Sequence, residues 1–268
     1  IVHCEHGERC GGCSLLGLTQ QQQLAHKHSA VSVAHARFGL LRNLPVKQVS
    51  AAESQLGYRT RAKLVVSPRG EIGLYARGSH DIVDIPACRV LSPELLRVTD
   101  VVRTRIRGGH SGLSGIDLRE VLHDGTRGVL VTLLGPSGAA IALEKLGHEI
   151  AQQEGVVGVA RSERERDAPT FFGAPPVVLA GKQAVPDELL PGQPYSLATH
   201  GSFVQANRTQ AAAIATRVID ATRTALGRLQ GARVLELYAG AGGLALCLHK
   251  LGAKLTLIER YGAALDGA

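Results

Sequence analysis

Short apolar runs that alternate with polar positions predict an α+β region over residues 1–198. The runs 63–67 and 71–75 flank Pro68, Arg69 and Gly70, a composition typical of a hairpin turn. Residues 123–125 (His-Asp-Gly) are the turn of a second expected hairpin. The other strands expected here are short and antiparallel in style, and they lie at 80–85, 119–122, 128–134, 156–161 and 176–180.

Three helices are expected among these strands. Thr19 and Gln22 have the spacing of a capping box, so a helix should follow to about Arg37. Ser92 and Pro93 form an N-cap and first-turn pair, and Gly108 is a stop signal, which predicts a helix over 93–107. The third helix is expected near 139–153.

The pattern changes near residue 199, and we assign residues 199–268 to a second domain. Residues 207–228 predict a helix whose apolar face comprises Ala211, Ile214, Ala215, Val218, Ile219, Thr222 and Leu226. The apolar run 232–238 is typical of a buried parallel strand. A glycine-rich stretch, a short helix to Leu251 and a strand over 254–258 follow it. This βαβ order is the start of a Rossmann-like α/β domain.

Composition narrows the class of protein. The chain has 268 residues and a net charge of +7, and a basic balance favours an anionic partner, above all nucleic acid. No apolar run approaches the ~20 residues of a membrane span, and no secretory signal is apparent. We therefore expect a cytoplasmic protein outside the membrane, with a monomer as the default state. The chain contains no Met, which favours a fragment of a longer sequence.

Four of the five cysteines indicate a metal centre. Cys4, Cys10 and Cys13 lie within ten residues, and the glycine pair between the last two lets the loop fold so that three sulfurs face one centre. Cys88 supplies a fourth thiol. Four thiolates suit either an iron–sulfur cluster or a structural zinc ion. Clustering and an odd count fit a metal site in a reducing compartment better than a set of disulfides.

The glycine-rich stretch 239–243 lets a ligand approach the backbone after the first strand of the βαβ unit. Gly240 and Gly242 fit the first two glycines of a dinucleotide fingerprint, with Ala245 at the third position. Glu259, at the end of the next strand, is placed to hydrogen-bond ribose hydroxyls. With Glu236 in the preceding strand, the stretch also resembles the first motif of methyltransferases that use S-adenosylmethionine.

Five ordered motifs resemble the RNA uracil-5-methyltransferases, and most closely their iron–sulfur-containing bacterial branch, which acts on 23S ribosomal RNA. They are C-x5-C-G-G-C from Cys4, Y-R-T-R-A-K at 58–63, S-H-D-I-V-D-I-P-A-C at 79–88, S-F-V-Q-A-N at 202–207 and V-L-E-L-Y-A-G-A-G-G at 234–243. The resemblance runs from Cys4 to Glu259. It implies S-adenosylmethionine as cofactor and RNA as partner. It also implies that Cys4, Cys10, Cys13 and Cys88 hold a [4Fe–4S] cluster, with zinc as the alternative.

The resemblance assigns cofactor contacts to individual positions. Gln205 resembles the glutamine that contacts S-adenosylmethionine, and Tyr238 occupies the cofactor-contacting aromatic position. Gly240 and Gly242 form the turn, and Glu259 matches the ribose carboxylate. The alternatives are that Gln205 and Asn207 cap the helix that starts there, that Tyr238 is a packing residue and that Glu259 is an exposed strand end.

Four residues are candidates for RNA contacts. Arg59, Arg61 and Lys63 alternate along an expected strand and therefore share one face, where they meet phosphates or form a solvated basic surface. Phe203 contacts the flipped target base or belongs to the core.

The catalytic groups of the family have no counterpart in this sequence. In the family a cysteine thiolate attacks carbon 6 of uracil, carbon 5 takes the methyl group, and a carboxylate base removes the carbon-5 proton. These groups lie in S-C-N-P and D-P-P-R-x-G-type motifs, and neither motif occurs here. The spare thiol, Cys247, lies among leucines in an expected helix and is interpreted as a packing residue. We therefore expect no catalytic residue in this chain. We expect the catalytic residues in a further part of a longer protein.

Other functions fit parts of the pattern. One is methylation of uracil in tRNA, and another is a non-catalytic RNA-binding module with a structural cluster. A third is a dinucleotide-dependent redox protein that uses the cluster to carry electrons.

Overall fold

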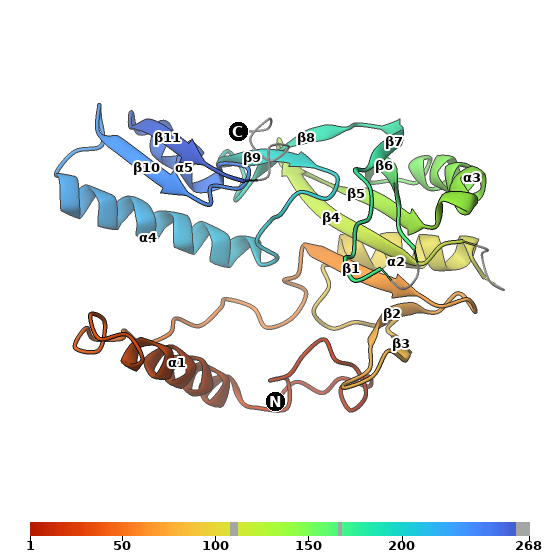
Figure 1. The fold of residues 1–268 in the computed structure, drawn as a ribbon, viewed down its shortest axis with the longest axis horizontal. Coiled ribbons are helices and arrows are strands. Elements are labelled where there is room, and N and C mark those ends of the chain that lie inside the picture. Colours follow the sequence, from red (N-terminus) through yellow and green to blue (C-terminus); the bar gives the residue numbers. More distant parts are fainter. Residues whose placement is uncertain (108–111, 166–167, 261–268) are drawn as a thin grey trace.

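A mixed seven-stranded sheet forms the centre of the molecule (Figure 1). The computed structural model describes residues 1–107, 112–165 and 168–260. The strand order is β3-β2-β1-β4-β5-β6-β7. The strands are β1 (Arg61–Val66), β2 (Ile72–Tyr75), β3 (Ile82–Asp84), β4 (Gly115–His123), β5 (Thr126–Gly135), β6 (Val156–Glu163) and β7 (Val177–Gly181).

Both expected hairpins are present, β1–β2 and β4–β5. Asp124 and Gly125 link β4 to β5 with φ values of 48° and 73°, which suits a two-residue turn between twisted strands. The expectation of an antiparallel style throughout is wrong at β5 and β6, which pair in parallel. The short helix η1 (Ser137–Ala139) and helix α3 (Ala140–Ala151) lie between them and supply the crossover that a parallel pair needs.

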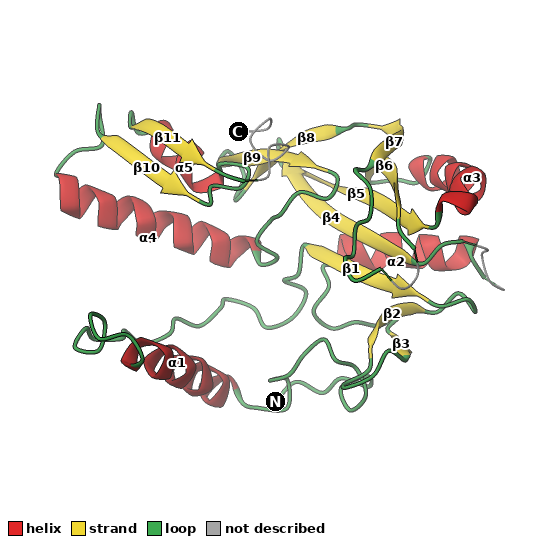
Figure 2. Cartoon of the chain, in the orientation of Figure 1, coloured by secondary structure: helices red, strands yellow, loops and turns green. Residues whose placement is uncertain are grey.

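Helices α2 (Pro93–Arg105) and α3 cover one face of this sheet (Figure 2). The Oγ of Ser92 accepts from the amide of Leu95, so α2 begins at the expected cap. The expected stop, Gly108, lies outside the described residues. The core between helices and sheet is aliphatic, and it includes Leu95, Val98, Leu143 and Ile150 from the helices and Leu64, Ile116, Leu118 and Leu133 from the strands. Each such side chain contributes about 1.5–3 kcal/mol on burial.

A hairpin that the sequence pattern did not predict lies on the opposite face of the sheet. It consists of β8 (Ala184–Glu188) and β9 (Pro194–Thr199). Val185 and Ala198 of the hairpin pack on Val121 and Leu130 of the sheet. Around this small apolar contact the face carries charged residues, among them Arg61 and Arg119.

The last described part of the chain is the expected βαβ unit. Helix α4 (Arg208–Leu226) leads to β10 (Arg233–Leu237), α5 (Gly243–His249) and β11 (Lys254–Ile258), and the two strands pair in parallel. Val218 and Ile219 of α4 and Leu248 of α5 pack on Val234 of β10.

The expectation of a fully buried strand at 232–238 is wrong on one face. Leu235 and Leu237 are 57% and 55% exposed, because both α4 and α5 cover the other face of the β10–β11 pair. Two residues of the expected apolar face of α4, Ile214 and Leu226, are also exposed.

Helix α1 (Gln20–Ala36) begins at the expected capping box. The amide of Gln22 donates to Thr19 Oγ1 and the amide of Thr19 donates to Gln22 Oε1. The helix has no buried residue, and in Figure 1 it lies apart from the sheet. Among the described helices, none is both long enough and apolar enough to cross a membrane.

Candidate cofactor turn and cysteine cluster

The turn between β10 and α5 has the backbone of a ligand-binding loop. Gly240 and Gly242 have φ values of 57° and 70°, a conformation that glycine adopts without steric cost. Tyr238 also has a positive φ, of 58°, which costs a non-glycine residue about 1–3 kcal/mol. Its side chain is 92% exposed, so the interpretation of Tyr238 as a packing residue is wrong. A strained, exposed aromatic residue at this turn is typical of a site of function.

Glu259 lies against this turn. Its Oε2 accepts a hydrogen bond of 2.9 Å from the amide of Gly240, and the amide of Ala239 donates to the carbonyl of Ile258 at 3.2 Å. The fold thus brings together Gly240 and Glu259, which the sequence assigned to one cofactor site. Glu259 is half-buried, so the alternative that it is an exposed strand end is wrong.

Glu236 is a further acidic group at this turn, which sequence reasoning noted only as part of a motif. Burial raises the pKa of Glu236, and a hydrogen bond from the Ala245 amide acts in the opposite direction. Its Oε2 is buried and has no hydrogen-bond partner among the described residues. The feature of the sequence that could have identified Glu236 as a site residue is a carboxylate inside an otherwise apolar strand.

Phe203 and Gln205 lie on residues 199–207, which we call the connecting segment because it joins β9 to α4. Phe203 is 71% exposed, so the alternative that it belongs to the core is wrong. Val204, between the two, is buried, and Gln205 is exposed. The cap of α4 is Asn207, whose Oδ1 accepts from the amide of Gln210 at 3.1 Å. The capping alternative is therefore right for Asn207 and wrong for Gln205, whose side chain is exposed to solvent.

The three basic residues expected on one face have different surroundings. Arg59 lines the cavity beside the cysteines. Lys63 is exposed, and its ammonium lies 5.3 Å and 5.1 Å from the ring centroids of Phe171 and Phe172, within the range of cation–π attraction.

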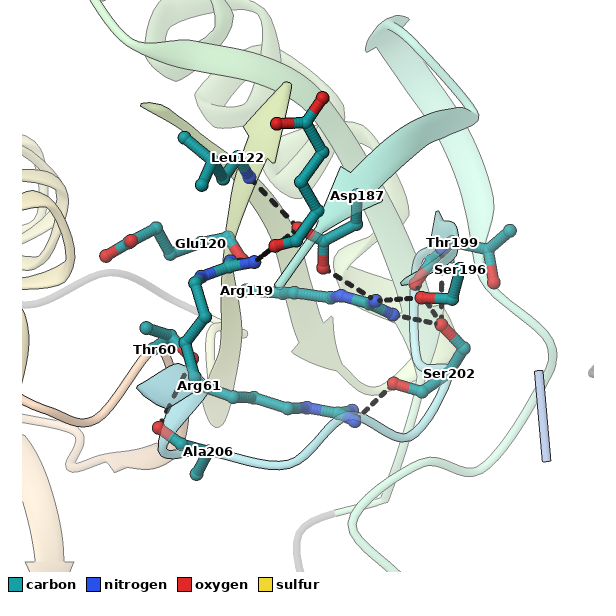
Figure 3. A network of polar contacts seen from close by, with 12 residues as sticks. Thr60, Arg61, Arg119, Glu120, Leu122, Asp187, Ser196, Thr199, Ser202 and Ala206 are labelled. Atoms are coloured by element: carbon teal, nitrogen blue, oxygen red, sulfur yellow. Dashed lines mark hydrogen bonds and ion pairs between the residues drawn. The ribbon is translucent and has the colours of Figure 1, made fainter. Parts of the chain in front are cut away.

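Arg61 is buried in a network of polar contacts (Figure 3). Its guanidinium donates to both carboxylate oxygens of Asp117, with N–O distances of 3.1 Å. A phosphate contact by Arg61 does not fit this placement, because the connecting segment and Asp117 already occupy its donors. Sequence reasoning missed this because the partners are distant in the chain.

Cys4, Cys10, Cys13 and Cys88 line one cavity of about 210 Å³, as the sequence predicted for a shared centre. The pKa of Cys13 is raised by burial and then by the nearby sulfurs of Cys88, Cys10 and Cys4, while Arg59 opposes the shift. All five cysteines of the chain are free thiols.

The backbone around the cavity holds the cysteine loop against the sheet. The backbone of Cys10 forms an isolated antiparallel β-bridge with Ala76, which directly follows β2. The amide of Gly11 donates to the carbonyl of Tyr75 at 3.0 Å. A Cβ at Gly11 would lie 2.8 Å from that carbonyl oxygen, which explains the glycine. Arg77 Nη2 donates to the carbonyl of Gly7 at 3.1 Å.

The cavity has the right donors for a metal centre. Four thiols from the amino-terminal loop and from the segment after β3 meet there, and this donor set suits either a structural zinc ion or an iron–sulfur cluster.

Cys247 takes no part in either arrangement. It packs beside Ala211 and Ala215 of α4, and burial raises the pKa of its thiol. A raised pKa reduces the thiolate fraction, so the interpretation of Cys247 as a packing residue agrees with the structure.

Known proteins resemble the chain along nearly its whole length. No protein-family model matches it. It is 30% identical to the 23S rRNA (uracil(1939)-C(5))-methyltransferase RlmD of Chromohalobacter salexigens, over 98% of this chain and 54% of that protein. It is 27% identical to an uncharacterized RNA methyltransferase of Thermosynechococcus vestitus, over 99% of this chain and 60% of that protein. The chain thus spans between half and two thirds of the length of these relatives.

The fold resembles a solved structure as well. The crystal structure of the Pyrococcus abyssi tRNA (uracil-54, C5)-methyltransferase in complex with S-adenosyl-L-homocysteine aligns with a TM-score of 0.71 at 21% identity. The alignment covers 96% of this chain and 60% of that chain. The chain is therefore similar in sequence to RNA methyltransferases, among them proteins named as uracil-C5-methyltransferases, and it has the fold of the solved enzyme.

Proposed function

We propose that the protein containing this chain transfers a methyl group from S-adenosylmethionine to carbon 5 of a uracil in RNA, with 23S rRNA as the substrate. The observation that carries the proposal is the Gly240–Glu259 contact, in a chain that aligns over 98% of its length with 54% of a uracil-C5-methyltransferase. Relatives named as 23S rRNA enzymes are 29% and 30% identical to it, which supports rRNA as the substrate.

In this proposal the chain supplies the cofactor side of the reaction. Glu259 accepts hydrogen bonds from the ribose hydroxyls, Tyr238 contacts the cofactor, and the turn at Gly240 and Gly242 leaves room for the ligand at the backbone. Gln205 contacts the cofactor from the connecting segment. Phe203 offers an exposed ring on which the flipped uracil stacks. The adjacent basic groups, Arg59 and Lys63, are the proposed phosphate contacts.

We further propose that Cys4, Cys10, Cys13 and Cys88 hold a [4Fe–4S] cluster with a structural role. The support is the four thiols at one cavity, together with the ordered motifs that resemble the iron–sulfur-containing branch of the family. All four thiols are then ligands, so none of them is the nucleophile that attacks carbon 6. When bound, the cluster ties the amino-terminal loop to the segment after β3.

The activity is tested with the full-length protein, labelled S-adenosylmethionine and transcribed RNA. We expect 5-methyluridine by mass spectrometry in a 23S rRNA fragment and none when the reactive uridine is replaced by cytidine. Methyl transfer to tRNA but not to the 23S rRNA fragment would show that tRNA is the substrate. RNA binding without any binding of S-adenosylhomocysteine would instead support the non-catalytic module. Tight binding of NAD or a flavin in its place would support the redox protein.

The cluster is tested by anaerobic purification of wild type, Cys88→Ser and the matched control Cys247→Ser. We expect absorbance near 400 nm and about four iron atoms per chain in wild type and in Cys247→Ser, and a loss of both in Cys88→Ser. A colourless wild-type protein with one zinc ion would refute the cluster and leave the proposed methyl transfer standing.

A further inference from the structure

We propose that Arg61 and Arg119 are positioning residues, which hold the connecting segment so that Phe203 and Gln205 face the site. The inference rests on the proposed function, because it gives a purpose to the placement of these two side chains. Both arginines come from the central sheet, Arg61 from β1 and Arg119 from β4, and they pair side by side in the β1–β4 register.

Arg61 fixes the backbone at the start of the segment. Its Nη1 donates to the carbonyl of Ser202, and its Nη2 donates to the carbonyl of Gly201 at 3.1 Å. The bidentate pair with Asp117 fixes the plane of the guanidinium, since that side chain is 3% exposed. One planar group thus orients two successive peptide units next to Phe203.

Arg119 fixes the side chain of Ser202. Its Nη1 donates to the Oγ of Ser202, while its Nη2 pairs with Asp187 at 3.2 Å. The Ser202 hydroxyl in turn donates to the carbonyl of Thr199 at 2.9 Å and accepts from the amide of Thr199 at 3.2 Å. These contacts close a tight turn just before Phe203, as Figure 3 shows.

The other end of the segment is held by Thr60, which directly precedes β1, and by residues of β4 and β8. The amide and hydroxyl of Thr60 donate to the carbonyl of Ala206, at 2.8 Å and 3.2 Å. Arg208, the first residue of α4, pairs with Asp187 at 2.8 Å and donates to the carbonyl of Glu120 at 3.1 Å.

With both ends held, the residues between them have little freedom. Val204 points inward, and Phe203 and Gln205 are exposed to solvent. Pre-organising these two side chains reduces the entropy that ligand binding would otherwise cost. The sheet therefore contributes to affinity without touching the ligand.

The test compares Arg61→Lys and Ser202→Ala with the matched control Arg103→Lys in the full-length protein. Arg103 also donates to an aspartate and a carbonyl, those of Asp84 and Ile72, and these residues belong to β2, β3 and α2 rather than the connecting segment. The readouts are the Kd for S-adenosylhomocysteine by calorimetry, hydrogen exchange over residues 199–207 without ligand, and the melting temperature.

We expect Arg61→Lys and Ser202→Ala to raise that Kd about ten- to a hundredfold and to speed exchange over 199–207. Arg103→Lys should lower the melting temperature but leave the Kd within about twofold of wild type. An unchanged Kd and unchanged exchange in Ser202→Ala would overturn the inference, even if Arg61→Lys fails to fold. If the wild type binds S-adenosylhomocysteine but methylates no RNA, the proposed function fails while the positioning role stands.

Discussion

Substitution of Asp187 tests how much the buried ion pairs with Arg119 and Arg208 contribute to the free energy of unfolding. Its carboxylate is 0% exposed and pairs with both Arg119 and Arg208, and its Oδ1 also accepts from the amide of Leu122 at 3.0 Å. Burial lowers the pKa of Arg119, and the charge of Asp187 opposes that shift. Asp187→Asn leaves two buried guanidinium groups without this carboxylate.

Removing one partner of a buried ion pair costs about 3–5 kcal/mol. We therefore expect the free energy of unfolding of Asp187→Asn to fall by that amount. With a urea slope near 3 kcal/mol/M, the unfolding midpoint, followed by circular dichroism, should fall by about 1 M or more.

Asp84→Asn is the matched control. Asp84 pairs with Arg103 at 2.6 Å, but its side chain is 36% exposed, so the loss should be no more than about 1 kcal/mol. Equal midpoints for Asp187→Asn and wild type would refute the reasoning that this network stabilises the fold.

Two further substitutions test packing and protonation. Gly243→Ala would place a Cβ 2.3 Å from the ring of Tyr195, so overpacking should cost about 1–3 kcal/mol, measured by thermal unfolding; an unchanged melting temperature would contradict it. Burial lowers the pKa of His200, so the unfolded chain binds more protons and the stability due to neutral His200 is lost as the pH falls below about 6.5. His200→Gln should flatten the decline of unfolding free energy between about pH 7 and pH 5, and an identical slope in both proteins would show that another group titrates.

Local rules anticipated most elements because each depends on residues close in sequence. The Thr19 capping box, the Asp-Gly turn of β4–β5 and the Asn207 start of α4 are satisfied within a few residues. The β8–β9 hairpin was missed because Pro186 and Pro194 are typical of loops. Among the described strands these two pair only with each other, and strands at an edge tolerate proline.

The candidate site shows the same division. The spacing of Cys4, Cys10 and Cys13, and of Gly240 and Glu259, identified groups that the fold brings together. Glu236 stands out in the sequence as a carboxylate inside an apolar strand. No local pattern shows that its Oε2 lacks a hydrogen-bond partner among the described residues, because the burial of this atom comes from the packing of α5 on β10.

Arg61 shows what the sequence by itself determined and what only the tertiary structure decided. The period of a strand places Arg61 and Lys63 on one face, and the structure agrees. Arg61 is covered by Gly201 and Ser202, which lie about 140 residues later in the chain. Because the burial of a side chain depends on which distant segments pack over it, an arginine that looks like a phosphate ligand in the sequence is a buried support of the site in the structure.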